Sequence, residues 1–266
     1  MTNSIQQAAQ SIIASMQRAY GGESTLLDAD ESHFRHLDLR FYRDFQGQHE
    51  AQGFRHLRDV EVAEISNSPT TFVARTFIRS MVSADGGTVA YYYQVKPRMG
   101  RLIRHLLRGL KNGRWLDTPR FFLRTLKTKH CTDYESELSN GHFITTSNAQ
   151  SAGNLSLPST IDSEFHPYGT SPVVVANRHR QRLDAYFASA PDVRPRLVRT
   201  VEDLTQMQRR IKAQKNAYRA AVKWVTQADL ERMSLGNPLL AEAVYEEIRR
   251  QLGADGGEGR SATIQP

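Results

Sequence analysis

TFVARTFIRSMVSADGGTVAYYYQVK (residues 71–96) is the stretch that decides the fold class. Both of its arms are rich in Val, Ile, Thr, Phe and Tyr, the residue types that are enriched in β-strands. The Asp85-Gly86-Gly87 break between the arms is typical of a turn. The stretch therefore predicts two consecutive antiparallel strands, Thr71–Met81 and Thr88–Lys96.

Strand patterns continue on both sides of this stretch. Arg58–Ile65 predicts a strand before it, separated by the break at Asn67-Ser68-Pro69. A hairpin is predicted over His130–Asn148, with Asn140-Gly141 as a two-residue turn. We therefore expect an α+β fold with a mostly antiparallel sheet of about five strands.

Helical patterns occupy both ends of the sequence. A polar N-terminal helix is expected to end at Gly21-Gly22, and a second helix to run from Ser32 to about Gln52. Ser171 followed by Pro172 predicts a helix start. The other expected helices cover 201–224, 227–235 and 238–252, the first two opening with capping-box patterns at Thr200–Asp203 and Thr226–Asp229.

These elements predict the division of the 266-residue chain, whose length fits one large domain or a domain with an appended helical region. Residues 151–170 are rich in Ser, Pro, Gly and Asn, which is typical of a connector. The expected parts are an α+β core in 1–150 with a helical insertion near 98–128, the connector in 151–170, a helical region packed on the core in 171–252, and a disordered tail in 253–266.

Composition indicates a cytoplasmic protein. Hydrophobic residues make up 39% and charged residues 24% of the chain, which is ordinary for a globular domain. The mean hydropathy is -0.54, and no stretch approaches the roughly 20 apolar residues of a membrane span. The first residues lack a signal-peptide pattern, and the single cysteine, Cys131, cannot form an intramolecular disulfide.

Positive charge is concentrated in residues 96–129, which we call the basic segment. It contains eleven Lys or Arg and one acidic residue, Asp117, a net charge of +10. The rest of the chain has 24 basic and 27 acidic residues, a net charge of -3. One short region therefore holds the whole positive excess of the protein, which points to an anionic partner.

The basic segment has the pattern of two amphipathic helices. From Met99 to Leu110 the apolar residues recur at spacings of three and four, which places them along one stripe of a helix. Thr118-Pro119 then predicts a second helix start. The expected apolar docking stripe is Leu102, Leu106, Leu110, Trp115 and Phe122. The expected anion-binding residues are Arg98, Arg101, Arg104, Arg108, Lys111, Arg114, Arg120, Arg124 and Lys127.

Three hypotheses compete for this helical pair. In the simplest, the apolar stripes pack on the sheet and the cations only face water. In the second, the pair lies on an anionic membrane surface at the inner face of the membrane. In the third, the cations contact nucleic-acid phosphates. The scarcity of acidic residues favours an anionic partner, and the dense apolar stripe favours the membrane. The preferred function is therefore that of a non-enzymatic binding protein.

The predicted hairpin carries the alternative, a metal-dependent hydrolase. With the expected two-residue turn, Asp133, Glu135 and Glu137 share one face with His142, a combination that could ligate a divalent ion or transfer a proton. The simpler interpretation is a solvated, charged sheet face. In that case Arg75 and Arg79 on a neighbouring strand could neutralise the carboxylates.

The remaining patterns give no stronger candidate. His179, flanked by Arg178 and Arg180, is expected on a second basic surface. Nucleotide-binding glycine loops, the nucleophile-elbow pattern and paired-cysteine motifs are absent from the sequence, so no cofactor is expected. The C-terminal helices offer a further surface for a protein partner.

Overall fold

The protein is described by a computed structural model. The described residues are 2–22, 25–63, 73–104, 127–150, 155–233 and 237–254. The chain divides into two compact units. The helical unit comprises residues 1–23, 151–159 and 209–266, and the sheet unit comprises residues 24–150 and 160–208. The N-terminal helix therefore groups with the C-terminal helices, whereas the sequence placed it with the α+β core.

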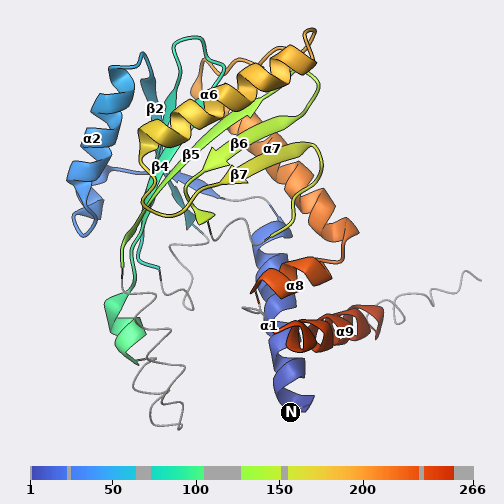
Figure 1. Ribbon diagram of the computed structural model, residues 1–266. Coiled ribbons are helices and arrows are strands. Elements are labelled where there is room, and N and C mark those ends of the chain that lie inside the picture. Colours follow the sequence, from blue (N-terminus) through green and yellow to red (C-terminus); the bar gives the residue numbers. More distant parts are fainter. Residues whose placement is uncertain are drawn as a thin grey trace, which may run out of the picture. The chain divides into compact units, whose positions relative to one another are not determined.

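The sheet unit is built on one mixed sheet whose strand order follows the sequence from β1 to β7 (Figure 1). Neighbouring strands are antiparallel except the last pair, because β6 and β7 run parallel. The strands are β1 (Leu26–Asp28), β2 (Arg55–Val62), β3 (Phe77–Val82), β4 (Val89–Val95), β5 (Lys129–Glu137), β6 (Phe143–Ser147) and β7 (Ile161–Phe165).

The α+β class is confirmed, but the strand count of about five is too low. The strands β2, β3 and β4 and the hairpin overlap the predicted strands. β2 begins three residues earlier than predicted, and β3 begins at Phe77 rather than at Thr71. β1 and β7 were missed, and β7 lies inside the predicted connector. β1 has only three residues, which is too short for a clear sequence pattern. β7 pairs with β6 in parallel, so the sequence next to β7 contains no hairpin turn that would indicate a strand.

Helices α2 (Leu39–Glu50) and α6 (Pro172–Ser189) cover one face of the sheet. The single helix predicted from Ser32 to Gln52 is broken at Asp38, which separates the short 3-10 helix η1 (Glu31–Phe34) from α2. Asp38 caps α2 by accepting a hydrogen bond from the Phe41 amide. The buried side-chain amide of Gln94 on β4 bonds both the N–H and the carbonyl of Asp38 at 3.0 and 2.6 Å.

Aromatic side chains form the core beneath α2. The ring of Tyr42 stacks on Phe77 of β3 with 4.1 Å between centroids, and Tyr92 of β4 meets Tyr42 edge-on at 4.6 Å. Phe45 stacks on Tyr92 with 4.7 Å between the ring centroids. Each of these rings is at most 2% exposed, so α2 packs its aromatic side chains onto the sheet.

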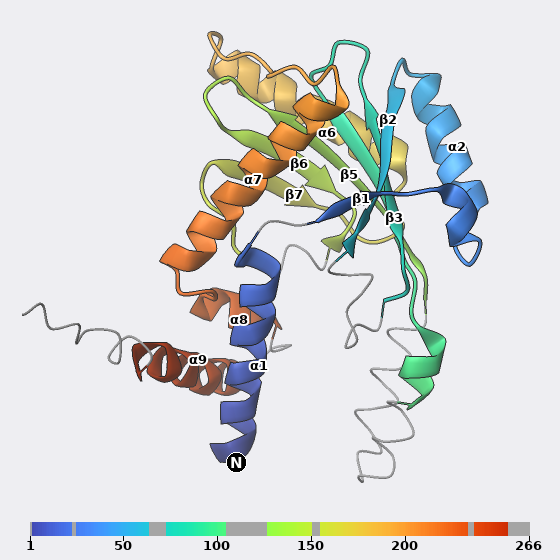
Figure 2. The same cartoon turned by 180° about the vertical axis from the view of Figure 1, so that it is seen from behind.

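The opposite face of the sheet is more polar. Tyr91 and Tyr93 of β4 lie on this face, and their register partners on β5 are Asp133 and Cys131. Helix α7 (Val201–Ala221) begins over this face, as Figure 2 shows from behind, and its residues 201–208 belong to the sheet unit. Gln208 lies beside the Tyr91 hydroxyl.

The helical unit contains α1 (Thr2–Tyr20), the rest of α7, α8 (Gln227–Met233) and α9 (Pro238–Ala254). Its apolar core includes Ala9 of α1, Leu230 of α8 and Ile248 of α9. The predicted capping box at the start of α8 is confirmed, because Thr226 and Asp229 exchange hydrogen bonds at 2.9 and 3.1 Å.

Asp229 also forms a buried ion pair with Arg219 of α7. The Asp229 Oδ2 atom lies 2.5 Å from Arg219 Nη1, and these side chains are 0% and 1% exposed. Burial raises the pKa of Asp229, but hydrogen bonds from the Thr226 and Ser156 amides and from Arg219 outweigh it. They hold the pKa of this carboxyl well below its usual value.

Replacing Asp229 by Asn is expected to lower the free energy of unfolding by about 3–5 kcal/mol at neutral pH, because Arg219 keeps its buried charge without a counterion. The folded pKa is lower than the unfolded one, so the contribution of the carboxylate is complete above about pH 4 and is lost as the pH falls further. Urea unfolding at pH 7 and pH 3 checks both statements. Asp192→Asn, at an exposed site, is the control, and equal losses in both variants would contradict the prediction.

Candidate functional site

The basic segment leaves and rejoins the sheet at one end of it. Val95, the last residue of β4, is the register partner of Lys129, the first residue of β5. Residues 99–104 are helical, which agrees with the start of the first predicted helix. The predicted residues Leu106, Arg108, Leu110, Lys111, Arg114, Trp115, Arg120, Phe122 and Arg124 lie outside the described residues.

In the described helical residues 99–104 of the basic segment, one apolar side chain is buried and two are exposed. Leu102 is only 1% exposed, so in this structure it is a packing residue and cannot act as a docking residue. Met99 and Ile103 are 41% and 45% exposed, and Arg104 next to them is exposed as well. The apolar surface that this turn presents therefore comes from Met99 and Ile103, one helical turn apart.

The two lysines at the ends of the basic segment contact the sheet unit. The Lys96 ammonium donates a hydrogen bond to the His36 carbonyl, just before α2. The Lys129 ammonium lies 4.1 Å from the centroid of the Tyr168 ring, a cation–π contact. These two cations hold the ends of the segment, whereas Arg104 and Lys127 are exposed.

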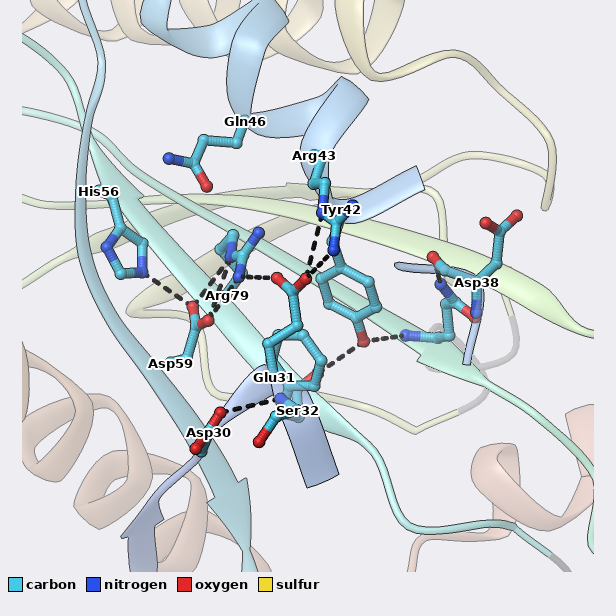
Figure 3. A network of polar contacts seen from close by, with 12 residues as sticks. Asp30, Glu31, Ser32, Asp38, Tyr42, Arg43, Gln46, His56, Asp59 and Arg79 are labelled. Atoms are coloured by element: carbon cyan, nitrogen blue, oxygen red, sulfur yellow. Dashed lines mark hydrogen bonds and ion pairs between the residues drawn. The ribbon is translucent and has the colours of Figure 1, made fainter. Parts of the chain in front are cut away.

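A charge network joins η1, α2, β2 and β3 (Figure 3). At its centre is the buried guanidinium of Arg79, whose Nη2 atom lies 2.6 Å from Asp59 Oδ2 and 2.8 Å from Glu31 Oε2. Glu31 also accepts from Arg43 at 2.7 Å, and Asp59 lies 2.8 Å from His56 Nε2. We call these five residues the Arg79 network.

The network shifts the pKa values of its members. Burial alone raises the pKa of Asp59, but hydrogen bonds and positive charge from His56 and Arg79 outweigh it and lower that pKa overall. The pKa of Glu31 is lowered against burial in the same way by Arg43 and Arg79. Both carboxylates are therefore charged at neutral pH and are already matched by cations.

Other carboxylates of the sheet unit are matched in the same way. Arg75 pairs with Glu61 at 2.5 Å, so neither Arg75 nor Arg79 neutralises the hairpin carboxylates as the sequence suggested. Glu137 is 2% exposed and lies 3.2 Å from Arg196. In the described part of the sheet unit, the carboxylates that form ion pairs with arginines outside the basic segment include Asp28, Glu31, Asp44, Asp59, Glu61, Glu137, Asp162 and Glu164.

The β5–β6 hairpin has a different turn from the predicted one. Leu138 donates to the His142 carbonyl at 2.8 Å, which leaves the three residues 139–141 in the loop. Gly141 closes this loop with a φ of 81°, a left-handed conformation that suits glycine. The register therefore differs by one residue from that of a two-residue turn, and every β6 side chain changes face.

This register separates His142 from the three carboxylates. Asp133, Glu135 and Glu137 pair with Ser147, Thr145 and Phe143, and all lie on the polar face. His142 lies opposite Leu138 on the other face, with its ring 6.2 Å from that of Tyr186. Within the described part of the chain no group of three or more His, Cys, Asp or Glu side chains is arranged to hold a metal ion.

Instead, the hairpin carboxylates lie beside tyrosines that the sequence did not connect with them. Asp133 accepts a hydrogen bond from the Ser147 hydroxyl. Burial, together with the charge of Glu135, raises the pKa of Tyr91. Burial and the charge of Asp133 do the same for Tyr93. The alternation of Tyr91 and Tyr93 was visible in the sequence, but only the pairing of β4 with β5 brings them to the carboxylates.

Comparison of the chain with protein-family models, with curated proteins and with solved structures found no match. Among the described helices, none is both long enough and apolar enough to cross a membrane.

Replacing Arg79 by Met is expected to raise the pKa of Asp59 and to lower the free energy of unfolding at pH 7 by about 3 kcal/mol, because two partly buried carboxylates lose their shared counterion. The pKa of Asp59 is lower in the folded than in the unfolded protein, so the Asp59 carboxylate stabilises the fold above the unfolded pKa and loses this effect in acid. The difference in unfolding free energy between the variant and the parent protein therefore narrows below about pH 4.

Carbon-13 titration of the Asp59 carboxyl and urea unfolding test this expectation. Arg35→Met, at an exposed position before α2, is the control. An Asp59 carboxyl that titrates identically in the Arg79 variant and in the parent protein would show that the network does not set its charge.

Proposed function

We propose that the protein is a non-enzymatic binding protein that docks to an anionic membrane surface through the basic segment. The docking residues are Arg104 and Lys127 together with the cations of residues 105–126, and Met99 and Ile103 supply apolar contact. Arg98 and Arg101 add positive charge at the start of the segment. The proposal rests on the charge of this segment, +10 in a chain whose other residues carry -3.

The ion pairs of the sheet unit support the proposal. The carboxylates of the Arg79 network and of Glu61, Asp162 and Glu164 pair with arginines that lie outside the basic segment. A net charge of -3 in the rest of the chain is also too small to neutralise +10. A segment with this net positive charge attracts anionic surfaces from a distance of about a Debye length.

The apolar side chains favour a membrane over a purely ionic partner. Met99 and Ile103 are half exposed beside Arg104, the combination found on helices that lie in the interface of a bilayer. Each cation near an anionic membrane contributes on the order of 1 kcal/mol, so several together give stable binding. Attraction of this kind weakens with salt, whereas the apolar contribution persists.

Nucleic acid is the alternative partner, and the burial of Leu102 is the observation that favours it. A helix whose apolar side packs against protein presents only its cations, which suits phosphate contacts. The affinity of such a complex falls steeply with salt because phosphate counterions are released. The same protein variants distinguish the two partners.

Charge reversal in the basic segment (Arg104→Glu, Arg108→Glu and Lys111→Glu together) is expected to abolish sedimentation with vesicles that contain phosphatidylserine. The matched control reverses Arg18, Arg35 and Arg249, which are exposed residues outside the segment, so both variants have the same net charge. The control variant should still sediment, because local rather than total charge drives the docking.

Replacing Met99 and Ile103 by Ser should reduce vesicle binding at high salt and leave binding to random-sequence DNA unchanged. If the parent protein retards DNA in a gel and does not bind the vesicles, the partner of the basic segment is nucleic acid and not a membrane. Equal vesicle binding by the segment variant and the control variant would refute docking through the segment.

A further inference from the structure

A cavity of about 390 Å³ opens in the sheet unit between α6, the β3–β4 turn and the residues after α2. Its apolar wall is made by Phe54, Leu183, Phe187 and Pro195, and its polar wall includes Thr88 and Arg180. This volume lies in the range of small-molecule sites, which combine apolar walls with a few placed polar groups. The basic segment contributes none of its described residues to the cavity.

A chain of hydrogen bonds leads from the interior to this cavity. Arg182 Nη1 lies 2.8 Å from the Thr146 hydroxyl, which lies 3.0 Å from Nδ1 of His179. His179 Nε2 lies 3.0 Å from the Ser136 hydroxyl, and Ser136 lies 3.1 Å from the Thr88 hydroxyl in the cavity wall. Residues of β5, β6 and α6 and the end of the β3–β4 turn thus meet in one polar chain.

His179 is neutral in this chain. It is 2% exposed, which overturns the expectation that it belongs to a basic surface with Arg178 and Arg180. Burial and the neighbouring charge of Arg182 lower the pKa of His179 to about 3. At neutral pH the ring therefore carries one proton, so it donates through one nitrogen and accepts through the other.

Arg182 can only donate, so the Thr146 hydroxyl accepts from it. If the Thr146 proton goes to Nδ1 of His179, then Nε2 donates to Ser136, and Ser136 donates to the Thr88 oxygen. In that arrangement the Thr88 hydroxyl keeps its own proton for an acceptor atom of a ligand in the cavity.

The charges around the cavity disfavour an anionic ligand. Asp85 and Asp184 line it with Arg180, a net charge of -1. The Asp85 carboxylate accepts from the Ser83 hydroxyl at 2.5 Å and from the Gly87 amide at 3.0 Å, and together with the charge of Arg180 these bonds lower its pKa. The Asp85 carboxylate is therefore fixed by hydrogen bonds within the turn, and its negative charge offsets the positive charge of Arg180.

We infer that this cavity binds a neutral, amphipathic small molecule whose carbonyl oxygen accepts a hydrogen bond from Thr88 and whose apolar body contacts Phe54, Leu183 and Phe187. The inference is independent of docking through the basic segment. The net negative charge of the wall disfavours a free carboxylate at the same position, and a protonated amine has no lone pair to accept the Thr88 hydrogen bond.

Three matched probes test this inference, and their affinities are measured by amide chemical shifts on the full-length protein. The probes are 2-phenylacetamide, phenylacetate and 2-phenylethylamine, which share one ring and differ in charge and acceptor. The amide is expected to bind more tightly than phenylacetate. Its shifts should map to Thr88, Leu183 and Phe187.

Thr88→Val removes the hydroxyl while nearly keeping the volume of the side chain. It should lower the affinity for 2-phenylacetamide by about three- to tenfold, the effect of one hydrogen bond. The amine should be unaffected by this change. Thr88→Ser keeps the hydroxyl and should restore amide binding, which a merely structural role of Thr88 does not predict.

Ala84→Trp provides a second variant in case Thr88→Val fails to fold. Ala84 is exposed at the cavity, and a bulky ring there should block the amide without disturbing the core. Three outcomes overturn the inference: amide binding that survives both Thr88→Val and Ala84→Trp, tighter binding of phenylacetate than of the amide, or shifts that map elsewhere.

Discussion

The buried guanidinium of Arg79 is the interaction on which the arrangement of the sheet unit depends. It lies between carboxylates from two elements that precede it in the chain, Asp59 on β2 and Glu31 on η1. The central carbon Cζ of the guanidinium also lies 5.5 Å from the ring centroid of Phe77 and 5.6 Å from that of Tyr42. A cation that is buried in this way is stable only when its partners are fixed, so one side chain sets the positions of η1, α2 and β2 on β3.

Ion pairs of the same kind occupy many of the acidic residues in the sheet unit. Glu31, Asp59 and Glu61 are held by arginines on the strands and helices around them, and Glu137 is held by Arg196. Acidic residues in the sheet unit therefore serve the packing of that unit. The cations between β4 and β5 are concentrated in a segment that has a single acidic residue, so the excess charge follows from where the carboxylates are used.

The sequence was most informative where a structure is set by residues that are close in the chain. The helix starts at Ser171-Pro172 and Thr226–Asp229 were predicted correctly because a cap needs only three or four consecutive residues. The hairpin register was wrong because Asn-Gly fits both a two-residue turn and a three-residue loop, and a single bond from Leu138 to His142 decides between them. That one-residue difference places His142 on the face opposite to the carboxylates of the predicted cluster.

β7 was missed for a related reason, because its partner in the sheet is reached by a long connection rather than by a turn. The charge of the basic segment could be read from the sequence, whereas the burial of Leu102 and His179 depends on tertiary packing.

The way in which the two units share the chain has a consequence for biosynthesis. The helical unit takes its first helix from residues 1–23, a short piece from residues 151–159 and the remainder from residue 209 onward. The first helix therefore emerges from the ribosome long before most of its core partners exist, while the sheet unit has all its residues once residue 208 has been made. Folding during translation can therefore begin with the sheet unit, whereas α1 gains its core partners only after α8 and α9 have been made. Cutting the gene at a single point cannot yield both units intact.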